Sequence, residues 1–201
     1  MTPRTERQQQ IEDAAYRVLE RRGFAGATML AIAREARASH ETLYRWYGDK
    51  TGLFRALVVR NAEAVRQMLT TQIARGHDPM QTLARLGPDL VDLLTHPRAI
   101  ALNRAAAADP GGDLAAAIAA AGRGTIGPLI AEVLVAARDR GALRFDDPQA
   151  ALGLYLDLLV GDLQHRRVIG LDPPPDADQR QARAAQALDR LRRLLDGRDA
   201  A

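Results

Sequence analysis

Apolar residues recur three or four positions apart along most of the chain, which is the spacing of one face of an α-helix. The first apolar stripe consists of Ile11, Ala14, Ala15, Val18 and Leu19. It ends before a glycine that follows two arginines, a typical helix stop with cations near the carboxyl end. The sequence has no alternating strand pattern of useful length and no internal repeat. This pattern predicts an all-α fold.

Two short helices and one long helix follow in the first third of the chain. Thr28 is a good N-cap for "MLAIAREA", and after a short break Ser39 can cap "HETLYRWY". After Gly48, Asp49 can cap a long helix that starts near Lys50. Its apolar stripe comprises Leu53, Leu57, Val58, Ala62, Val65 and Leu69.

The remainder of the chain predicts longer Ala- and Leu-rich helices. Proline and glycine mark the breaks between them at residues 75–79, 95–97, 109–113, 140–143 and 172–178. With 201 residues, 47% of them hydrophobic, the chain can bury a substantial core. We expect a small N-terminal domain, residues 1–52, and a larger helical domain, residues 53–201.

The positive charge is concentrated in the first domain. Residues 1–60 carry 11 Lys+Arg and 7 Asp+Glu, a net of +4, whereas residues 61–201 carry 17 and 18, a net of −1. A surface that binds a polyanion is therefore expected in the first third. Although the chain is only 4% aromatic, Tyr44, Trp46 and Tyr47 lie there within four positions.

The absence of cysteine excludes disulfides, thiolate metal sites and a cysteine nucleophile. It also fits a reducing cytoplasm, where we expect the protein to act. The N-terminal "MTPRTERQQQ" has no apolar core and does not resemble a signal peptide. No run of about eighteen apolar residues is present, so no membrane span is expected.

Two short helices joined by a tight turn, with a basic bias, indicate a helix-turn-helix. The small Ala33 lets the two helices approach, and Leu43 provides an apolar anchor in the second. In such a motif the second helix enters the major groove of DNA.

The sequence here resembles the tetracycline-repressor (TetR/AcrR) family of bacterial regulators. Thr28, Ile32 and Ala33 match the family pattern Thr-x-x-x-Ile-Ala. Further matches in register are Ala36, Ser39, Thr42, Leu43, Tyr44, Lys50 and Leu53, with Tyr47 in the position of a phenylalanine. The departure is Arg37, in the position of the usual glycine of the turn. If that position needs positive φ, a non-glycine residue costs about 1 kcal/mol.

The resemblance implies that the third helix is the recognition helix. His40, Glu41 and Thr42 are placed to reach base edges, while Tyr44 and Arg45 are placed to reach phosphates. Lys50 matches the family's phosphate-contacting lysine, and the helix that Thr28 caps can point its amides at a phosphate. The full predicted DNA-binding set is Thr28, Arg37, Ser39, His40, Glu41, Thr42, Tyr44, Arg45, Trp46 and Lys50.

Some roles in this set stay open. Trp46 faces either the core or the DNA, and His40 either reads a base or stands beside a bridging water. Glu41 either accepts from a cytosine amino group or faces away, because a carboxylate repels phosphate. Arg4 and Arg7 form either a minor-groove arm or, as we expect, a disordered tail.

The second domain resembles the ligand-binding and dimerisation half of the family. This implies a homodimer on a palindromic double-stranded operator, with half-sites about 34–36 Å apart or somewhat more, and an apolar or amphipathic small-molecule effector. The candidate pocket residues are Leu90, Leu94, Leu102, Asn103, Arg104, Leu156 and Leu159. The candidate dimer faces are Leu129, Val133, Leu134 and Ala137, and Leu152, Tyr155, Leu156 and Leu159. The alternative is that these residues are buried within one subunit, as some of them certainly are.

Other chemistries find little support. "GRGTIG", residues 122–127, reads G-x-G-x-x-G, but "LAAAIAAA" before it is helical, whereas a dinucleotide loop follows a strand. Asp162 and His165 could form half of a metal site, but no other histidine has a matching spacing. We therefore expect no cofactor, no metal and no enzyme. The sequence predicts a DNA-binding transcriptional regulator, in this family usually a repressor; the alternative is a helical small-molecule-binding protein that does not bind DNA.

Overall fold

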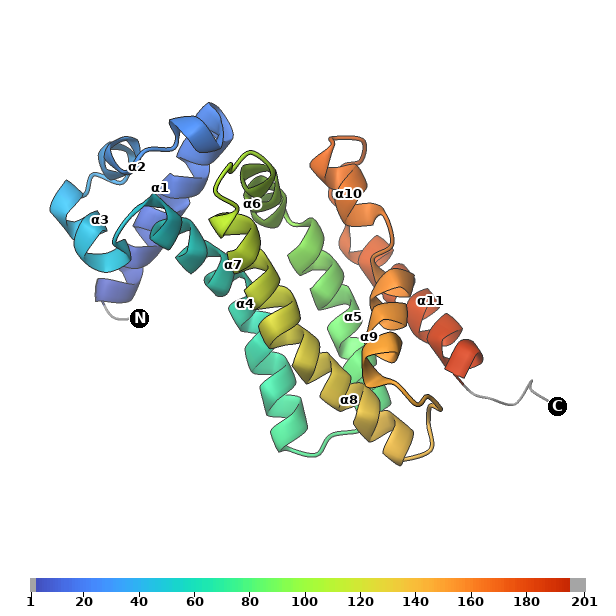
Figure 1. Ribbon diagram of the computed structural model, residues 1–201. Coiled ribbons are helices and arrows are strands. Elements are labelled where there is room, and N and C mark those ends of the chain that lie inside the picture. The colour runs from blue at the N-terminus through green and yellow to red at the C-terminus, as the bar shows by residue number, and fades with distance from the viewer. Residues whose placement is uncertain (1–2, 196–201) are drawn as a thin grey trace. The chain divides into compact units, whose positions relative to one another are not determined.

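The computed structural model describes residues 3–195, and within them every regular element is a helix, which confirms the all-α prediction (Figure 1). The chain divides into two compact units. Within the described residues, unit 1 comprises residues 3–61 and 97–120, and unit 2 comprises residues 62–96 and 121–195. The functional boundary that we expect after residue 52 stays a prediction.

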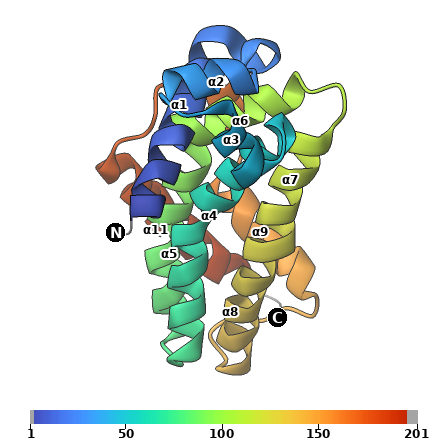
Figure 2. The ribbon, with the colours of Figure 1, turned by 90° about the vertical axis from the view of Figure 1, so that its left-hand side faces the viewer.

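Unit 1 contains the predicted helix-turn-helix. Its first four helices are α1 (Pro3–Gly26), α2 (Met29–Glu35), α3 (His40–Tyr47) and the first part of α4 (Lys50–Ala74). It also contains α6 (Pro97–Ala107) and nearly all of α7 (Asp113–Ala121). The helix α1 packs against α2 and α6, and α2 packs against α3 (Figure 2). At the expected stop in α1, Gly23 leaves the helical conformation with φ 66°.

The predicted caps set the helix starts in unit 1. The Thr28 hydroxyl accepts from the amide of Ala31 at 3.1 Å, and the Ser39 hydroxyl accepts from the amide of Thr42 at 3.1 Å. The Asp49 carboxylate accepts from the amide of Gly52 at 2.7 Å. Each cap satisfies an amide that has no partner inside its helix, which is why these boundaries could be predicted closely. The fully buried core includes Ile11, Ile32, Leu43, Leu53 and Phe54.

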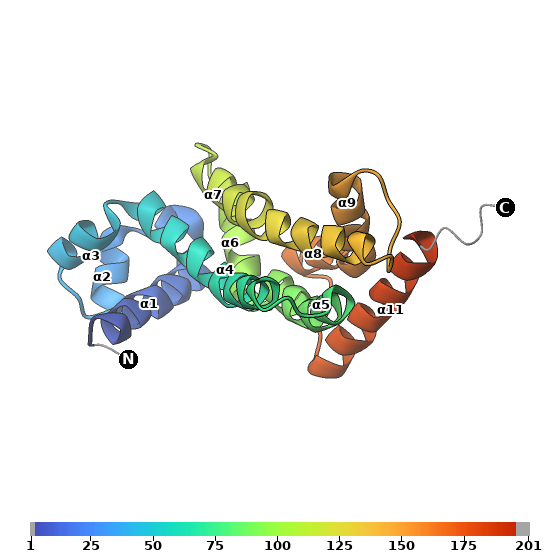
Figure 3. The ribbon, with the colours of Figure 1, turned by 90° about the horizontal axis from the view of Figure 1, so that it is seen from below.

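Unit 2 is a helical bundle. It contains the second half of α4, then α5 (Pro79–Thr95), the π-helical η1 (Gly122–Ile126), α8 (Gly127–Asp139), α9 (Pro148–Leu159), α10 (Leu163–Val168) and α11 (Ala177–Leu195). The helix α11 packs against α5 and α9, and α8 packs against α9 and α5 (Figure 3). A Cβ atom added to Gly87 of α5 would lie 2.6 Å from the Cβ of Ala184 in α11. The two helices are therefore in direct backbone-to-side-chain contact at this point.

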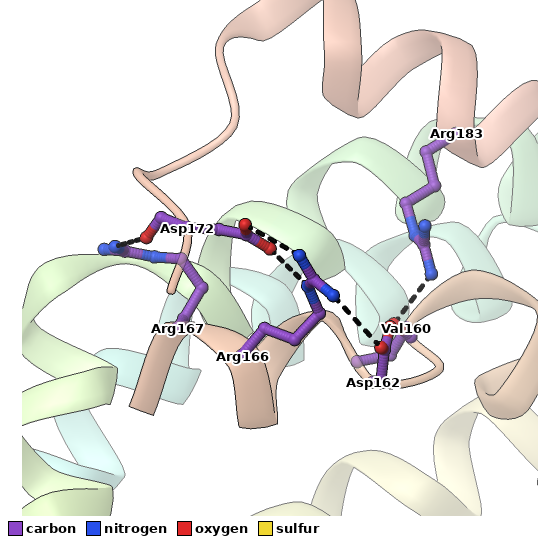
Figure 4. A network of polar contacts seen from close by, with 6 residues as sticks. All are labelled: Val160, Asp162, Arg166, Arg167, Asp172 and Arg183. Carbon is purple, nitrogen blue, oxygen red and sulfur yellow. Dashed lines mark hydrogen bonds and ion pairs between the residues drawn. The ribbon is translucent and has the colours of Figure 1, made fainter. Parts of the chain in front are cut away.

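The sequence pattern missed one break in unit 2. It marks no break between residues 143 and 172, but the structure ends α9 at Leu159 and begins α10 at Leu163. Between them Gly161 has φ 52°, the left-handed conformation that favours glycine. The guanidinium of Arg183, in α11, donates to the carbonyl of Leu159 at 2.5 Å. It also donates to the carbonyl of Val160 at 2.7 Å (Figure 4). It thus caps the carboxyl end of α9.

Arginines also fix the segment that follows α10. Arg166 forms an ion pair with Asp172 at 2.6 Å, and Arg167 donates to the carbonyl of Asp172 at 2.7 Å (Figure 4). Arg167 also donates to the carbonyl of Thr95, and Gln164 donates to the carbonyl of Leu94. The last carbonyls of α5 are therefore capped by side chains that lie some seventy residues later in the chain.

The glycine-rich "GRGTIG" lies within a helical stretch, as expected. Gly122 to Ile126 form a π-helix that follows α7 directly, so the strand that a dinucleotide loop requires is not there. The stretch Asp113–Asp139 is, within the described part of the chain, the one helix long and apolar enough to cross a membrane by length and composition. Its second half, α8, buries Ile130, Val133 and Leu134 in unit 2.

Most residues of the candidate dimer faces lie in the core of unit 2, and the dimer itself stays a prediction. Six of their residues are buried within the chain itself: Val133, Leu134, Ala137, Leu152, Tyr155 and Leu159. Only Leu129 and Leu156 are partly exposed. The apolar spacing on α8 and α9 could not distinguish packing within one chain from packing between two, and here it reflects the core of unit 2.

Candidate nucleic-acid interface

The helix α3 has one buried side and one exposed side. Leu43 is fully buried and anchors α3, whereas four polar side chains point to solvent. These four, His40, Glu41, Tyr44 and Arg45, are called the recognition face below. Tyr44 is 47% exposed, a high value for so large a ring. The recognition face thus offers donors, acceptors and one permanent positive charge to a partner.

Neighbouring side chains hold parts of this surface in place. The rings of His40 and Tyr44, one helical turn apart, lie with their centroids 4.5 Å apart. The hydroxyls of Ser39 and Thr42 lie 2.8 Å apart and form a hydrogen bond. Thr42 is only partly exposed, so of the three predicted base readers it is the least accessible. Thr28 is exposed at the start of α2, where its hydroxyl already serves as a cap.

The turn before α3 has the positive φ that glycine favours, although arginine occupies the position. Within residues 3–195, Arg37 is the only non-glycine residue with positive φ, 49°. A guanidinium nitrogen of Arg7 donates to the Arg37 carbonyl oxygen at 2.5 Å. The exposed side chain of Arg37 adds a cation beside the recognition face. Arg7 therefore supports a strained turn that a glycine would adopt without cost.

The expectation of a disordered N-terminal tail is wrong for the described residues. The helix α1 begins at Pro3, so Arg4 and Arg7 both lie on it. The Arg4 guanidinium lies 5.7 Å from the centre of the Trp46 ring, in cation–π geometry. Trp46 is partly exposed and so belongs neither wholly to the core nor wholly to the open surface.

The structure turns Lys50 inward. Its ammonium group donates a hydrogen bond to the carbonyl of Phe24 and lies 3.7 Å from the centre of the Phe24 ring. That ring packs edge-on against Phe54 at 5.4 Å. Burial lowers the pKa of Lys50, an effect that Asp109 partly opposes. In this conformation Lys50 ties the end of α1 to the start of α4.

The sequence pattern did not predict the buried carboxylate of Glu12 in unit 1. Glu12 of α1 is 2% exposed and forms an ion pair with Arg60 of α4 at 2.9 Å. Burial raises the pKa of Glu12 to about 7, although the Arg60 charge acts in the opposite direction. Burial also raises the pKa of Tyr47, at the end of α3, to about 12, and the Glu12 charge adds to this increase. The available signal was that Glu12 shares its helix face with the buried Tyr16 and Leu19.

The residue beside Glu12 connects α1 to α6. Asp13 forms an ion pair with Arg98 at 2.6 Å, and the Arg98 guanidinium lies 5.0 Å from the centre of the Tyr16 ring. Both contacts lie within unit 1. They add charged and cation–π contacts to the packing of α1 on α6.

The predicted pocket residues fall into two groups. Those on α5 and α9 are part of the apolar core of unit 2: Leu90, Leu94, Leu156 and Leu159. Leu102, Asn103 and Arg104 lie on α6 in unit 1; Leu102 is buried and Arg104 is exposed. The Asn103 side chain donates to the carbonyl of Ala99 at 2.9 Å. A shared pocket stays a prediction, and among the described residues no cluster of three metal-ligating side chains occurs.

A capped, exposed helix after a tight turn, in a unit with excess positive charge, defines a helix-turn-helix DNA-binding regulator. The model of bacterial regulatory proteins of the tetR family matches residues 11–57. The model of the AefR-like transcriptional repressor C-terminal domain matches residues 81–193, more than half of the chain. The protein belongs to the tetR family: it is a DNA-binding transcriptional regulator with a helical ligand-binding C-terminal domain.

Solved structures agree with this assignment. A TetR transcriptional regulator from Agrobacterium tumefaciens is 29% identical, with a TM-score of 0.72 over 97% of this chain and 95% of that chain. A putative TetR-family regulator from Mesorhizobium loti shares the fold at 22% identity, with a TM-score of 0.77 over 96% and 98%. So does FadR from Thermus thermophilus, solved with lauroyl-CoA, at 21% identity and a TM-score of 0.61 over 92% of each chain. No curated protein matches the chain.

Proposed function

We propose that the protein is a homodimeric cytoplasmic repressor that reads a palindromic DNA site with α3 and is released by an apolar or amphipathic small molecule. The observation that carries the proposal is the recognition face, four polar side chains held outward by the buried Leu43. We assign no catalytic role to any residue.

Within this proposal the side chains have different tasks. His40 and Glu41, at the amino end of α3, are exposed where base edges would lie, and they set sequence preference. Tyr44 and Arg45, one turn later, contact phosphates and so position the helix. Arg37 provides a second cation from the turn. The bound hydroxyls of Ser39 and Thr42 mainly shape the start of α3.

Two copies are needed because one helix-turn-helix contacts too few bases for useful specificity. A two-fold dimer places two α3 helices on half-sites about 34–36 Å apart, or somewhat more. Sedimentation at micromolar protein tests this directly, since a monomer contradicts the proposed dimer.

The effector class is supported by composition and by one relative. The residues predicted to surround it in unit 2 are all leucines in or against the apolar core. The Thermus thermophilus FadR was solved in complex with lauroyl-CoA, an amphipathic molecule. An effector weakens DNA binding only if it binds the DNA-free conformation more tightly. Titrating acyl-CoA esters of graded chain length into the protein–DNA complex tests this, and an unchanged complex at every length contradicts the acyl class.

The decisive experiment for DNA binding uses purified protein and fragmented DNA from its own genome. Fragments that are retained are sequenced, and the best site is measured by gel shift at several salt concentrations. Arg45→Ala should weaken binding and reduce the slope of log K against log salt by about 1. Arg190→Ala, which removes an exposed arginine from α11, is the matched control and should bind like the wild type. Absence of binding even at low salt would favour a ligand-binding protein that no longer reads DNA.

A further inference from the structure

The first two turns of α1 contact the chain at both ends of α3 (Figure 1). The Arg4 guanidinium lies 5.7 Å from the centre of the Trp46 ring, which belongs to the last turn of α3. One turn further along α1, Arg7 donates at 2.5 Å to the carbonyl of Arg37, in the turn before α3. The amino end of α1 is therefore fixed beside the recognition helix.

The positive charge of Arg4 is not neutralised within the protein. Later in α1, Arg17 and Arg21 both form ion pairs with Glu35. Among residues 3–195, Arg4 has no carboxylate partner of this kind, and its side chain is exposed. Glu6 lies two positions along the same helix and so faces another side of it. The contact with Trp46 thus leaves a cation available to an anionic partner.

An aromatic ring can fix a guanidinium and still leave its donors free. The ring attracts the cation through its face. The five N–H groups of arginine lie in the plane of the guanidinium and match the oxygens of a phosphate. Trp46 is itself partly exposed, so the pair lies at the protein surface. Arg4 is therefore positioned for an anion before the anion arrives.

The place of Trp46 on α3 indicates which part of DNA Arg4 would meet. In a helix-turn-helix the amino-terminal residues of the second helix contact base edges, and these are here His40 and Glu41. Trp46 lies at the opposite end of α3, so the Arg4 guanidinium lies toward the edge of the groove, where the phosphates run. An extended arm can enter the minor groove, but Arg4 is part of a helix.

We propose that Arg4 is a further DNA-binding residue: its guanidinium, positioned by the Trp46 ring, binds a backbone phosphate at the edge of the half-site. The inference rests on the proposed role of α3 as the recognition helix. Arg4 adds to Arg37 and Arg45 a third cation around α3, contributed by another helix. A phosphate contact positions the regulator on the duplex and carries no sequence information.

The first test measures the salt dependence of binding to the selected site and to unrelated DNA. Arg4→Ala should reduce the slope of log K against log salt by about 1, because one phosphate contact is lost. It should weaken binding to both DNAs equally, by about 3- to 5-fold. Arg4→Lys retains the charge and should keep most of the slope. Arg190→Ala, on α11, is the matched control and should keep the wild-type slope.

The second test examines the part played by Trp46. Trp46→Leu keeps an apolar side chain but removes the aromatic face that positions the guanidinium. In that background Arg4→Ala should lower affinity by less than about 2-fold, since the two residues act as a unit. Additive losses would show that Arg4 reaches its phosphate without Trp46, and they overturn the assigned geometry.

The third test needs no DNA. Trp46 is the only tryptophan of the chain, so its emission reports on this position alone. Arg4→Ala should increase the quenching of Trp46 by acrylamide, whereas Arg190→Ala should not. Equal quenching in the wild type and both variants overturns the contact between Arg4 and Trp46.

The outcomes separate this inference from the proposed function. Wild-type DNA binding together with an unchanged salt slope in Arg4→Ala overturns the inference alone. A loss confined to sites with A·T-rich flanks shows minor-groove reading and also overturns it. If the wild type binds no DNA even at low salt, the proposed function fails and the phosphate contact fails with it.

Discussion

The ammonium group of Lys50 lies 3.7 Å from the centre of the Phe24 ring and is hydrogen-bonded to the carbonyl of the same residue. Lys50 is the only lysine of the chain, and the family resemblance assigns it a contact with a DNA phosphate. In this structure it instead closes the junction between α1 and α4. In this conformation the positive charge of Lys50 makes contacts within the protein and not with DNA.

Lys50→Met separates these two roles. The variant keeps most of the unbranched side chain but loses the hydrogen bond and the cation–π contact, so the free energy of unfolding should fall by about 1–2 kcal/mol. Urea unfolding measures this loss. The salt slope of DNA binding should stay unchanged; a slope reduced by about 1 would show that Lys50 binds phosphate after all.

Arg37→Gly should change stability and DNA affinity in opposite directions. Glycine adopts φ 49° without strain, so the free energy of unfolding should rise by about 1 kcal/mol. DNA binding should weaken, because the exposed guanidinium next to the recognition face is lost. Urea unfolding and gel shifts on the same preparation check both effects, and a variant that is less stable than the wild type contradicts the strained-turn interpretation.

Arg7→Ala tests the support of the same turn. It removes the donor to the Arg37 carbonyl and should destabilise the protein by about 1–2 kcal/mol. In Arg37→Gly the loss should be smaller, since glycine holds the turn by itself. A double-mutant cycle measures this coupling; additive losses would show that the two residues act independently.

Glu12 should also make the stability of the fold depend on pH. Its pKa is raised from 4.5 to about 7 in the folded protein, so the folded state favours the neutral form. The resulting stabilisation is complete below about pH 4.5 and is lost as the pH rises through about 7. The free energy of unfolding of Glu12→Gln, compared with wild type, should therefore increase between these values. Urea unfolding at several pH values measures the difference, and parallel curves for the two proteins would contradict the buried titration.

The contact between α5 and α11 gives a prediction for unit 2. Gly87→Ala places a Cβ 2.6 Å from that of Ala184, so the helices must separate, and we expect a loss of about 1–3 kcal/mol. Gly153→Ala is the matched control, because its Cβ would meet nothing within 4 Å in the middle of α9. It should stabilise the protein by up to about 1 kcal/mol through helix propensity. Thermal unfolding of the two variants should therefore shift in opposite directions.

The sequence predicted the helices of unit 1 closely because local chemistry determines their ends. Thr28, Ser39 and Asp49 each cap a helix with a side chain that lies within three residues of its amide partner. Such contacts can be predicted from residues that are close together in the sequence. The exposed face of α3 also followed from local spacing around the buried Leu43.

The features that were missed depend on distant residues. The apolar spacing continues across Gly161, and a single glycine does not by itself end a helix. The break there also involves Arg183, which lies more than twenty residues later. The inward turn of Lys50 depends on Phe24, and the burial of Glu12 depends on Arg60 and Tyr47. None of these pairings is visible as a short-range pattern.

The guanidinium of Arg183 gives α11 a role that packing area alone does not describe. Truncating the protein after Val168 would remove the donor that meets the last carbonyls of α9, along with one wall of the apolar core. The shortened chain should fray from Leu159 backward, into the helix that buries Tyr155. A proteolytic cut between α10 and α11, followed by loss of the final segment, would therefore inactivate the regulator although the cut lies outside the DNA-binding helices.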